Sequence, residues 1–347
     1  MGNGSSTAAR EVEKQRATVA QDVSRRTIMA AAAAAPLAAA AATALPRPML
    51  AAAPAPEAQA PGFYRFKVGS FVVTTVNDGQ FARPNPAEGF VRNASPEAVR
   101  AALEEAMMPT DALTIPINLT VVHAGGRVIL FDSGTGGQLA PSAANGARNL
   151  QAAGIDPASV DLIVFSHFHG DHIAGLTTRE GQAIYPNAEI AVPEAEWAHW
   201  MDDGVMSRAP ENSRGGFQLA RAKFGPYASR VRRYGDGAEL APGIRAVSAH
   251  GHTPGHTVFH VADGNQQLLV LCDTTNHPAL FVRNPTWAAV FDMDADMAAQ
   301  SRRRILHRAA ADRAMVIGYH FPFPAAGRLR ARGDGFDFVP APWSSAL

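Results

Sequence analysis

Cysteine is almost absent from this sequence. Its 347 residues include one cysteine, Cys272, and 12 histidines. A single thiol excludes an intramolecular disulfide framework, and it also excludes a zinc finger built on cysteines. If the chain binds a metal ion, the ligands must therefore be histidine and carboxylate groups.

The sequence also lacks a net charge, since 31 basic residues balance 31 acidic residues. A nucleic-acid partner normally requires a basic patch, so none is predicted. Charged residues make up 18% of the chain and hydrophobic residues 47%, which fits a globular enzyme better than a disordered chain. The length allows one or two domains. No internal repeat is evident, and we predict one folded domain over residues 61–347.

No apolar run is suited to crossing a membrane. The longest candidate, Ala30 to Ala44, consists mainly of alanine and is interrupted by Pro36. Alanine contributes little transfer free energy, so stable membrane insertion is not expected. The pair Arg25-Arg26 precedes this run, which resembles a bacterial twin-arginine export signal. We expect residues 1–60 to be this signal and an Ala/Pro-rich linker, disordered or removed, and the protein to be periplasmic or secreted. The alternative is a cytoplasmic protein with a disordered extension.

Beyond residue 60 the pattern alternates between strands and helices. Ser95 and Pro96 predict a helix to about residue 107, because serine caps helices and proline suits their first turn. Further helices are predicted near 193–203 and at 294–311, and 206–237 is interpreted as a loop and helix excursion over the site. Strands are predicted at 64–68, 71–76, 113–123, 128–131, 161–165, 244–249, 257–261, 267–271 and 314–317.

These strands fall into two separate sets, with helices between and around them. Such an order predicts an α+β domain in which two β-sheets pack face to face and the helices lie outside. We expect the strands to deliver their polar ends to one common edge.

A dense polar cluster follows the apolar run at 162–165. Ser166 is followed by three histidines and one aspartate within six residues: His167, His169, Asp171 and His172. Imidazole nitrogen and carboxylate oxygen together suit zinc or a similar divalent ion. The ligands are too many for one ion with an open position, so two metal ions are predicted.

Three later positions offer complementary ligands. His252 lies in the segment His250-Gly251-His252-Thr253-Pro254-Gly255-His256, after a predicted strand. Asp273 ends the apolar run 268–272, and His320 follows another apolar run at 316–319. Each of the three lies just beyond a strand, which agrees with a site at the common edge.

The order HxHxDH, then GHTPGH, then a strand-terminal aspartate and a late histidine resembles the metallo-β-lactamase superfamily. The resemblance covers residues 63–340, and the joint pattern is much more specific than any of its parts. It implies a four-layer αβ/βα sandwich. The segments 251–257, 291–294 and 318–324 are most similar to the methyl parathion hydrolase-like branch, which contains organophosphate and lactone hydrolases.

Carried over position by position, the resemblance implies two divalent metal ions, which we expect to be Zn²⁺, and a divided ligand set. One ion is assigned to His167, His169 and His252, the other to Asp171, His172 and His320, with Asp273 bridging both. Paired metals about 3.5–4 Å apart can hold a bridging hydroxide, and metal binding lowers the pKa of water toward about 7. The expected reaction is attack of this hydroxide on an ester, lactone or phosphotriester. Asp171 and Asp273 are candidates for proton transfer.

The other histidines receive different interpretations. His256 is expected to be buried and structural or to contact a ligand, and His250 either contacts a ligand or is exposed. His277 either lines the pocket or is structural. Asp132 follows a strand and is interpreted as a carboxylate that orients a ligand. Structural roles are expected for the remaining candidates His123, His199, His260 and His307.

The preferred substrate is a small, uncharged ester or lactone, and acyl-homoserine lactones belong to that set. Five aromatic residues are candidates for an apolar pocket or, equally, for core packing: Phe168, Trp197, Trp200, Phe321 and Phe323. Less favoured alternatives are a β-lactamase, a glyoxalase-type thioesterase and an iron-dependent oxidoreductase on the same scaffold. A homodimer is compatible with the resembling branch.

Overall fold

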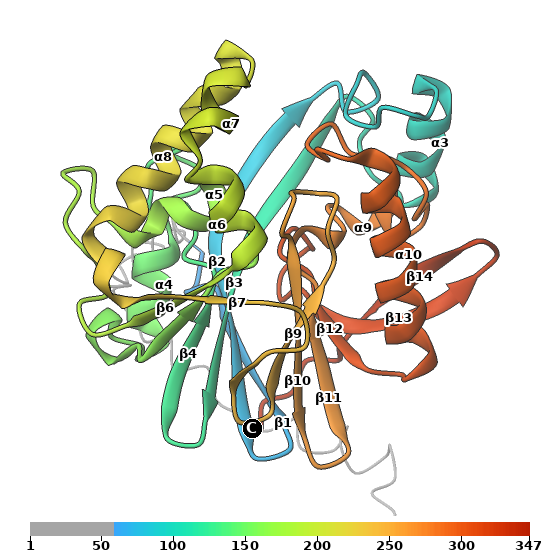
Figure 1. The fold of residues 1–347 in the computed structure, drawn as a ribbon. Helices are drawn as coiled ribbons and strands as arrows, with labels where there is room; N and C mark the ends of the chain where they lie inside the picture. The colour runs from blue at the N-terminus through green and yellow to red at the C-terminus, as the bar shows by residue number, and fades with distance from the viewer. Residues whose placement is uncertain (1–58) are drawn as a thin grey trace, which may run out of the picture. The chain divides into compact units, whose positions relative to one another are not determined.

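The computed structural model of this chain describes residues 59–347 (Figure 1). The predicted export signal and linker lie outside the described residues apart from positions 59 and 60, so both stay predictions. None of the helices within 59–347 combines the length and the apolar character needed to cross a bilayer.

The N-terminal sheet has seven strands that follow one another in chain order. Strands β1 to β4 are antiparallel neighbours, whereas β4 to β7 run parallel. Their bounds are β1 Phe63–Val68, β2 Phe71–Pro84, β3 Ala112–Ala124, β4 Arg127–Phe131, β5 Leu162–Val164, β6 Glu189–Pro193 and β7 Val231–Tyr234.

The C-terminal sheet also has seven strands, in the reverse order β14 to β8. Its pairs are antiparallel except for β11 and β12, which are parallel. Their bounds are β8 Glu239–Ala241, β9 Ile244–Ser248, β10 Thr257–Asp263, β11 Gln266–Val270, β12 Met315–Ile317, β13 Ala326–Arg332 and β14 Gly335–Pro340.

Helices lie on the outer sides of the two sheets, as Figure 1 shows: α4, α6 and α8 flank the first sheet, and α9 and α10 flank the second. The helix bounds are α3 Pro96–Glu105, α4 Gly146–Ala152, α5 Gly170–Ile173, α6 Glu194–Trp200, α7 Asp203–Arg208, α8 Arg214–Phe224, α9 Pro278–Phe281 and α10 Ala295–Ala311. The arrangement confirms the predicted α+β sandwich.

The core between the sheets is built from alternating apolar side chains of both. Phe131 of β4 packs against Phe259 of β10, with ring centroids 5.0 Å apart. Both rings are fully buried, and they belong to one apolar cluster that includes Val73 of β2 and Val316 of β12. Burial of such side chains is the main favourable term that holds the two sheets together.

Several elements agree closely with the sequence-based expectations. The turns at 69–70 and 125–126 close the predicted hairpins, and Gly125 and Gly126 both have positive φ angles, which glycine adopts without strain. The Ser95 side chain caps α3 by accepting a hydrogen bond from the amide of Ala98. Asp294 caps α10 in the same way.

Other elements escaped prediction. Strands β6, β7, β8, β13 and β14 were not expected, and the excursion at 206–237 contains the regular helix α8 and ends in β7. Phe217 and Phe224 of α8 are buried in the apolar cluster on the outer side of the first sheet. This helix therefore packs on the sheet as part of the helical layer. Short strands such as these depend on their neighbours in the sheet more than on their own sequence.

The topology brings separate strand ends to one edge. Strands β4 and β5 are parallel, and β9, β11 and β12 share one direction because β10 is antiparallel to both β9 and β11. The segments that follow these strands contain every predicted metal ligand. The expected common edge is therefore present.

Candidate metal centre

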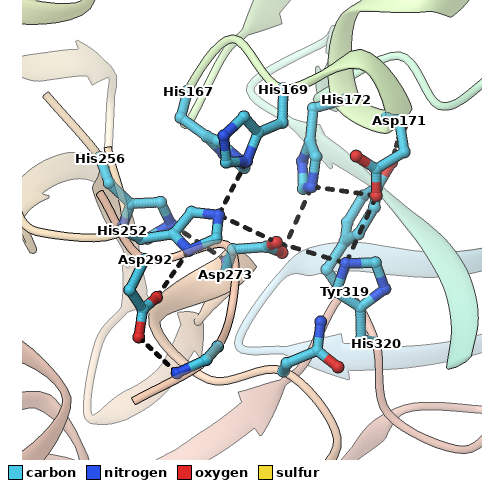
Figure 2. A network of polar contacts seen from close by, with 12 residues as sticks. His167, His169, Asp171, His172, His252, His256, Asp273, Asp292, Tyr319 and His320 are labelled. Atoms are coloured by element: carbon cyan, nitrogen blue, oxygen red, sulfur yellow. Dashed lines mark hydrogen bonds and ion pairs between the residues drawn. The ribbon is translucent and has the colours of Figure 1, made fainter. Parts of the chain in front are cut away.

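The cluster after β5 forms a tight turn into a short helix. His167 and His169 precede α5, while Asp171 and His172 lie in its single turn (Figure 2). The imidazoles of His167 and His169 lie 4.7 Å apart by ring centroid, and those of His167 and His172 lie 4.1 Å apart. The turn thus places three imidazoles and one carboxylate around a common volume.

His252 enters the site from the loop after β9. Its Nε2 lies 2.9 Å from Nδ1 of His169. The preceding Gly251 has a φ of 121°, and a Cβ there would lie 2.1 Å from the amide of Ala298 on α10. Only glycine permits this close approach, which fixes the direction in which His252 leaves the loop.

Asp273 connects the two predicted ligand groups. One carboxylate oxygen lies 3.3 Å from Nε2 of His172, and the other lies 3.3 Å from Nε2 of both His252 and His320. The side chain is 6% exposed. The structure therefore brings all seven predicted residues together, in two groups: His167, His169, His252 and Asp273, and Asp171, His172 and His320.

The donor atoms of this site fit divalent metal ions. Nε2 of His167, Nε2 of His172 and Oδ1 of Asp273 are buried without a hydrogen-bond partner. Buried polar atoms are normally paired, and unpaired ones indicate a partner such as an ion. Five imidazoles and two carboxylates suit a borderline ion such as Zn²⁺. Their role as ligands is a prediction that this geometry supports.

The carboxylates around His172 and His252 favour positive charge on these two imidazoles. Burial alone would lower the pKa of His172, but Asp273, Asp171 and Asp132 outweigh it and raise that pKa well above its usual range. Burial also opposes the charged form of His252, yet Asp273 and Asp292 raise its pKa to about 9. These nitrogens hold protons readily beside Asp273, and divalent ions are suited to replace those protons.

Asp132 orients His172 from behind. Its carboxylate accepts hydrogen bonds from the amide and hydroxyl of Ser166, both at 2.8 Å, and lies 2.9 Å from Nδ1 of His172. The contact agrees with its sequence-based interpretation. Because the carboxylate occupies Nδ1, Nε2 of His172 points toward the centre.

Asp292 performs the corresponding task for His252 and was missed as a functional residue. Its Oδ1 lies 2.9 Å from Nδ1 of His252, while Oδ2 accepts from Arg302 at 3.1 Å and from the amide of Ala289. Arg302, on α10, is 1% exposed and also donates to the carbonyl of Thr274, next to Asp273. The only sequence signal for Asp292 was its place in the segment 291–294, which resembles the methyl parathion hydrolase-like branch.

Tyr319 was also missed. Its ring stacks on His172 with centroids 3.9 Å apart, and its hydroxyl donates to the carbonyl of Asp171 at 2.7 Å. The neighbouring His320 is fixed by a contact of 2.8 Å between its Nδ1 and the carbonyl of Pro116. Tyr319 therefore supports the second ligand group from one side.

The three histidines for which the sequence left two interpretations, His250, His256 and His277, have different environments. His256 is buried, with Nδ1 at the carbonyl of Ala249 and Nε2 accepting from the amide of Asp273, so it supports the Asp273 segment. His277 is buried and caps α9 through its Nδ1. His250 is half-buried. Within 59–347 none of them joins the two ligand groups, and neither do the four histidines expected to be structural.

The aromatic candidates for the pocket are mostly core residues. Phe168, Trp200 and Phe321 are buried, and half-buried Trp197 packs against the outer core of the first sheet. Only Phe323, at 41% exposure, presents a large surface to solvent. Core packing is thus the correct interpretation for four of the five.

The sequence matches the metallo-beta-lactamase superfamily over residues 114–320. The chain belongs to this superfamily. The match spans every predicted ligand from His167 to His320, and the fold agrees with it. The chain is therefore a member of a superfamily of metal-dependent hydrolases.

Individual relatives are more distant. The N-acyl homoserine lactonase AttM of Azorhizobium caulinodans is 31% identical over 118 residues, which are 32% of this chain and 40% of AttM. The structure resembles a hydrolase AbOPH in the beta-lactamase superfamily, at 23% identity and a TM-score of 0.78, over 83% of this chain and all of the other. It also resembles AidC, described as a dizinc quorum-quenching lactonase, at 23% identity and a TM-score of 0.77, over 82% and 99% of the two chains. At these identities the structural likeness shows the fold.

Asp292→Asn should weaken metal binding. Both carboxylate oxygens of Asp292 face nitrogen atoms, of His252 and Arg302. Asparagine would place an N–H group against one of them, so His252 would lose its fixed orientation. We expect a loss of about 10–100-fold in affinity, measured by titration of Zn²⁺ against a chelator. Asp294→Asn is the matched control, because asparagine caps a helix as well as aspartate does. Equal affinities for the two variants would contradict the orienting role of Asp292.

His277→Asn should reduce the acid sensitivity of folding. Burial lowers the pKa of His277 to about 4, whereas an unfolded histidine titrates near about 6.5. Between these values the unfolded chain binds up to one more proton than the folded chain. The free energy of unfolding therefore decreases by up to about 1.4 kcal/mol, from this residue, for each unit by which the pH is lowered. Asparagine keeps the cap of α9. Urea unfolding of both chains without metal from pH 4.5 to 6.5 should give a slope smaller by about one proton in the variant, and equal slopes would refute the assignment.

Proposed function

We propose that this chain is a binuclear metal-dependent hydrolase that cleaves an uncharged lactone, ester or phosphotriester. The observation that carries the proposal is the position of Asp273. Its two oxygens lie 3.3 Å from imidazoles of both ligand groups, as expected for a carboxylate shared by two ions. The superfamily match supports the hydrolytic chemistry.

Each part of the ligand set has an assigned task. His167, His169 and His252 would hold one ion, Asp171, His172 and His320 the other, and Asp273 both. When bound, two divalent ions supply Lewis acidity and lower the pKa of water at the site toward about 7.

The protein groups then orient the reaction and handle its protons. Asp171 is 18% exposed, three times as much as Asp273, so its carboxylate has access to solvent. Its Oδ2 lies 3.4 Å from Nε2 of His320. We assign to Asp171 the transfer of a proton between the substrate's leaving oxygen and water, and to Asp273 the fixing of both ligand groups.

Exposed apolar side chains support an uncharged substrate. Phe291 and Met293 flank Asp292 and are 48% and 49% exposed, and the amide of Met293 binds the carbonyl of His252. Leu139 is 44% exposed and lies against Gly170, the residue after His169. Phe323 lies in the loop that contains His320, whereas the other three side chains come from segments that contact the His252 loop or the histidine cluster after β5. Apolar side chains beside a few polar groups are typical of small-molecule sites.

The relatives favour a lactone within this class. AttM is described as an N-acyl homoserine lactonase, and AidC is described as a lactonase in complex with a homoserine product. An acyl-homoserine lactone combines an uncharged ring ester with an apolar chain, which agrees with the exposed apolar residues. We propose it as the first candidate substrate, within the methyl parathion hydrolase-like branch.

The location of the enzyme is a separate proposal. Arg25 and Arg26 precede an alanine-rich run, so we propose export through the twin-arginine route to the periplasm or beyond. This route would carry a folded chain, with its metal site complete, across the membrane.

Asp273→Ala and His169→Ala should abolish hydrolysis and reduce bound metal. Each change removes a ligand atom from the centre. Metal content by elemental analysis and turnover of an aryl ester should fall together, while Asp203→Ala, at a side chain 86% exposed, should leave both unchanged. Full activity of a metal-free preparation would refute the scheme.

A substrate panel should separate the candidate reactions. Zinc-loaded enzyme is assayed with dihydrocoumarin, an acyl-homoserine lactone, paraoxon and a cephalosporin. We expect the lactones to be hydrolysed fastest, because they are uncharged and partly apolar. Turnover of the cephalosporin alone would refute the proposed substrate class.

A further inference from the structure

Glu196 is a buried carboxylate outside the seven predicted ligands. It is the third residue of α6, is fully buried, and takes part in none of the ion pairs found within 59–347. A buried carboxylate is costly unless hydrogen bonds compensate it. Its hydrogen bonds therefore indicate what it does.

Glu196 accepts hydrogen bonds from both loops that lead to one predicted metal ion. Its Oε2 accepts from the amide of Phe168 at 3.1 Å, and its Oε1 accepts from the amide of Gly255 at 2.6 Å. The indole of Trp200 donates to Oε2 at 2.7 Å. Phe168 lies between His167 and His169, whereas Gly255 lies three residues after His252.

The loop after β9 presses closely on α6 at this point. A Cβ at Gly255 would lie 2.5 Å from the amide nitrogen of Glu196, so a larger residue would push the loop away. A hydrogen bond from the amide of Thr257 to the carbonyl of Ser166 joins the bases of the same two loops. Glu196 joins them again, nearer the histidines.

We propose that Glu196 is a positioning residue that sets the spacing between the pair His167 and His169 and the single His252. The inference rests on the proposed binuclear site, in which these three imidazoles share one ion. Within 59–347, no hydrogen bond or ion pair joins Glu196 to a ligand side chain. A carboxylate suits the task because it only accepts hydrogen bonds, and here three N–H groups converge on it.

The test is a competition titration of Zn²⁺ against a chelator, applied to Glu196→Gln. The amide of glutamine would point a donor at one of the two loop amides, so that the loops separate. We expect the affinity for one ion to fall by about 10–100-fold and the other to stay unchanged. His252→Ala and His320→Ala identify which of the two affinities belongs to which ligand group. Glu196→Gln should lower the affinity for the same ion that His252→Ala affects.

Two further variants separate positioning from general stability. Leu103→Ala removes a fully buried side chain of α3, in an apolar cluster that contains no residue of either loop, so it should lower the unfolding temperature and leave both affinities unchanged. Glu196→Asp retains the charge but is too short to reach both loops, and it decides the matter if the glutamine variant does not fold.

The outcomes are distinguishable. Unchanged affinities in the folded Glu196 variants, or a loss that matches His320→Ala, would overturn the positioning role. A failure of the unaltered chain to bind two ions, or of the two histidine variants to lose one each, would instead overturn the proposed function.

Discussion

The centre depends on one buried carboxylate at the junction of two sheets. Asp273 follows β11 of the C-terminal sheet, yet one of its oxygens lies next to His172, in the helix that follows β5 of the N-terminal sheet. Burial alone would raise the pKa of the Asp273 carboxyl, but the opposite charges of His320 and His172 outweigh it and hold that pKa well below its usual range. Because the charged partners come from both halves of the fold, the charge balance of the centre holds only when the two sheets are packed together.

Around this centre, three further carboxylates act through hydrogen bonds. Asp132 orients His172, Asp292 orients His252, and Glu196 holds the loops that contain His167 and His252. Each of the three accepts hydrogen bonds from N–H groups. Asp132 and Asp292 thereby fix the orientation of an imidazole, whereas Glu196 fixes the positions of two loops. Mutation of outer groups of this kind typically lowers metal affinity by about 10–100-fold.

The seven residues that the structure brings together in the candidate centre were predictable because they are concentrated in sequence and chemically distinctive. Four of the seven lie between His167 and His172, and the other three each follow an apolar run. The hairpins and the capped helices α3 and α10 were predictable for a similar reason, since their signals are local. Asp292, Glu196 and Tyr319 were not, because each acts through contacts with segments distant in sequence. The strands β13 and β14, which pair with each other, likewise depend on that pairing more than on local pattern.

Arg302 gives α10 a role in how the chain would exchange its metal with solution. Its guanidinium, fully buried, holds Asp292 on one side and the carbonyl of Thr274, beside Asp273, on the other. A displacement of α10 would therefore loosen the support of His252 and that of Asp273 at the same time, and local opening of this helix would be one route by which bound metal exchanges with solution.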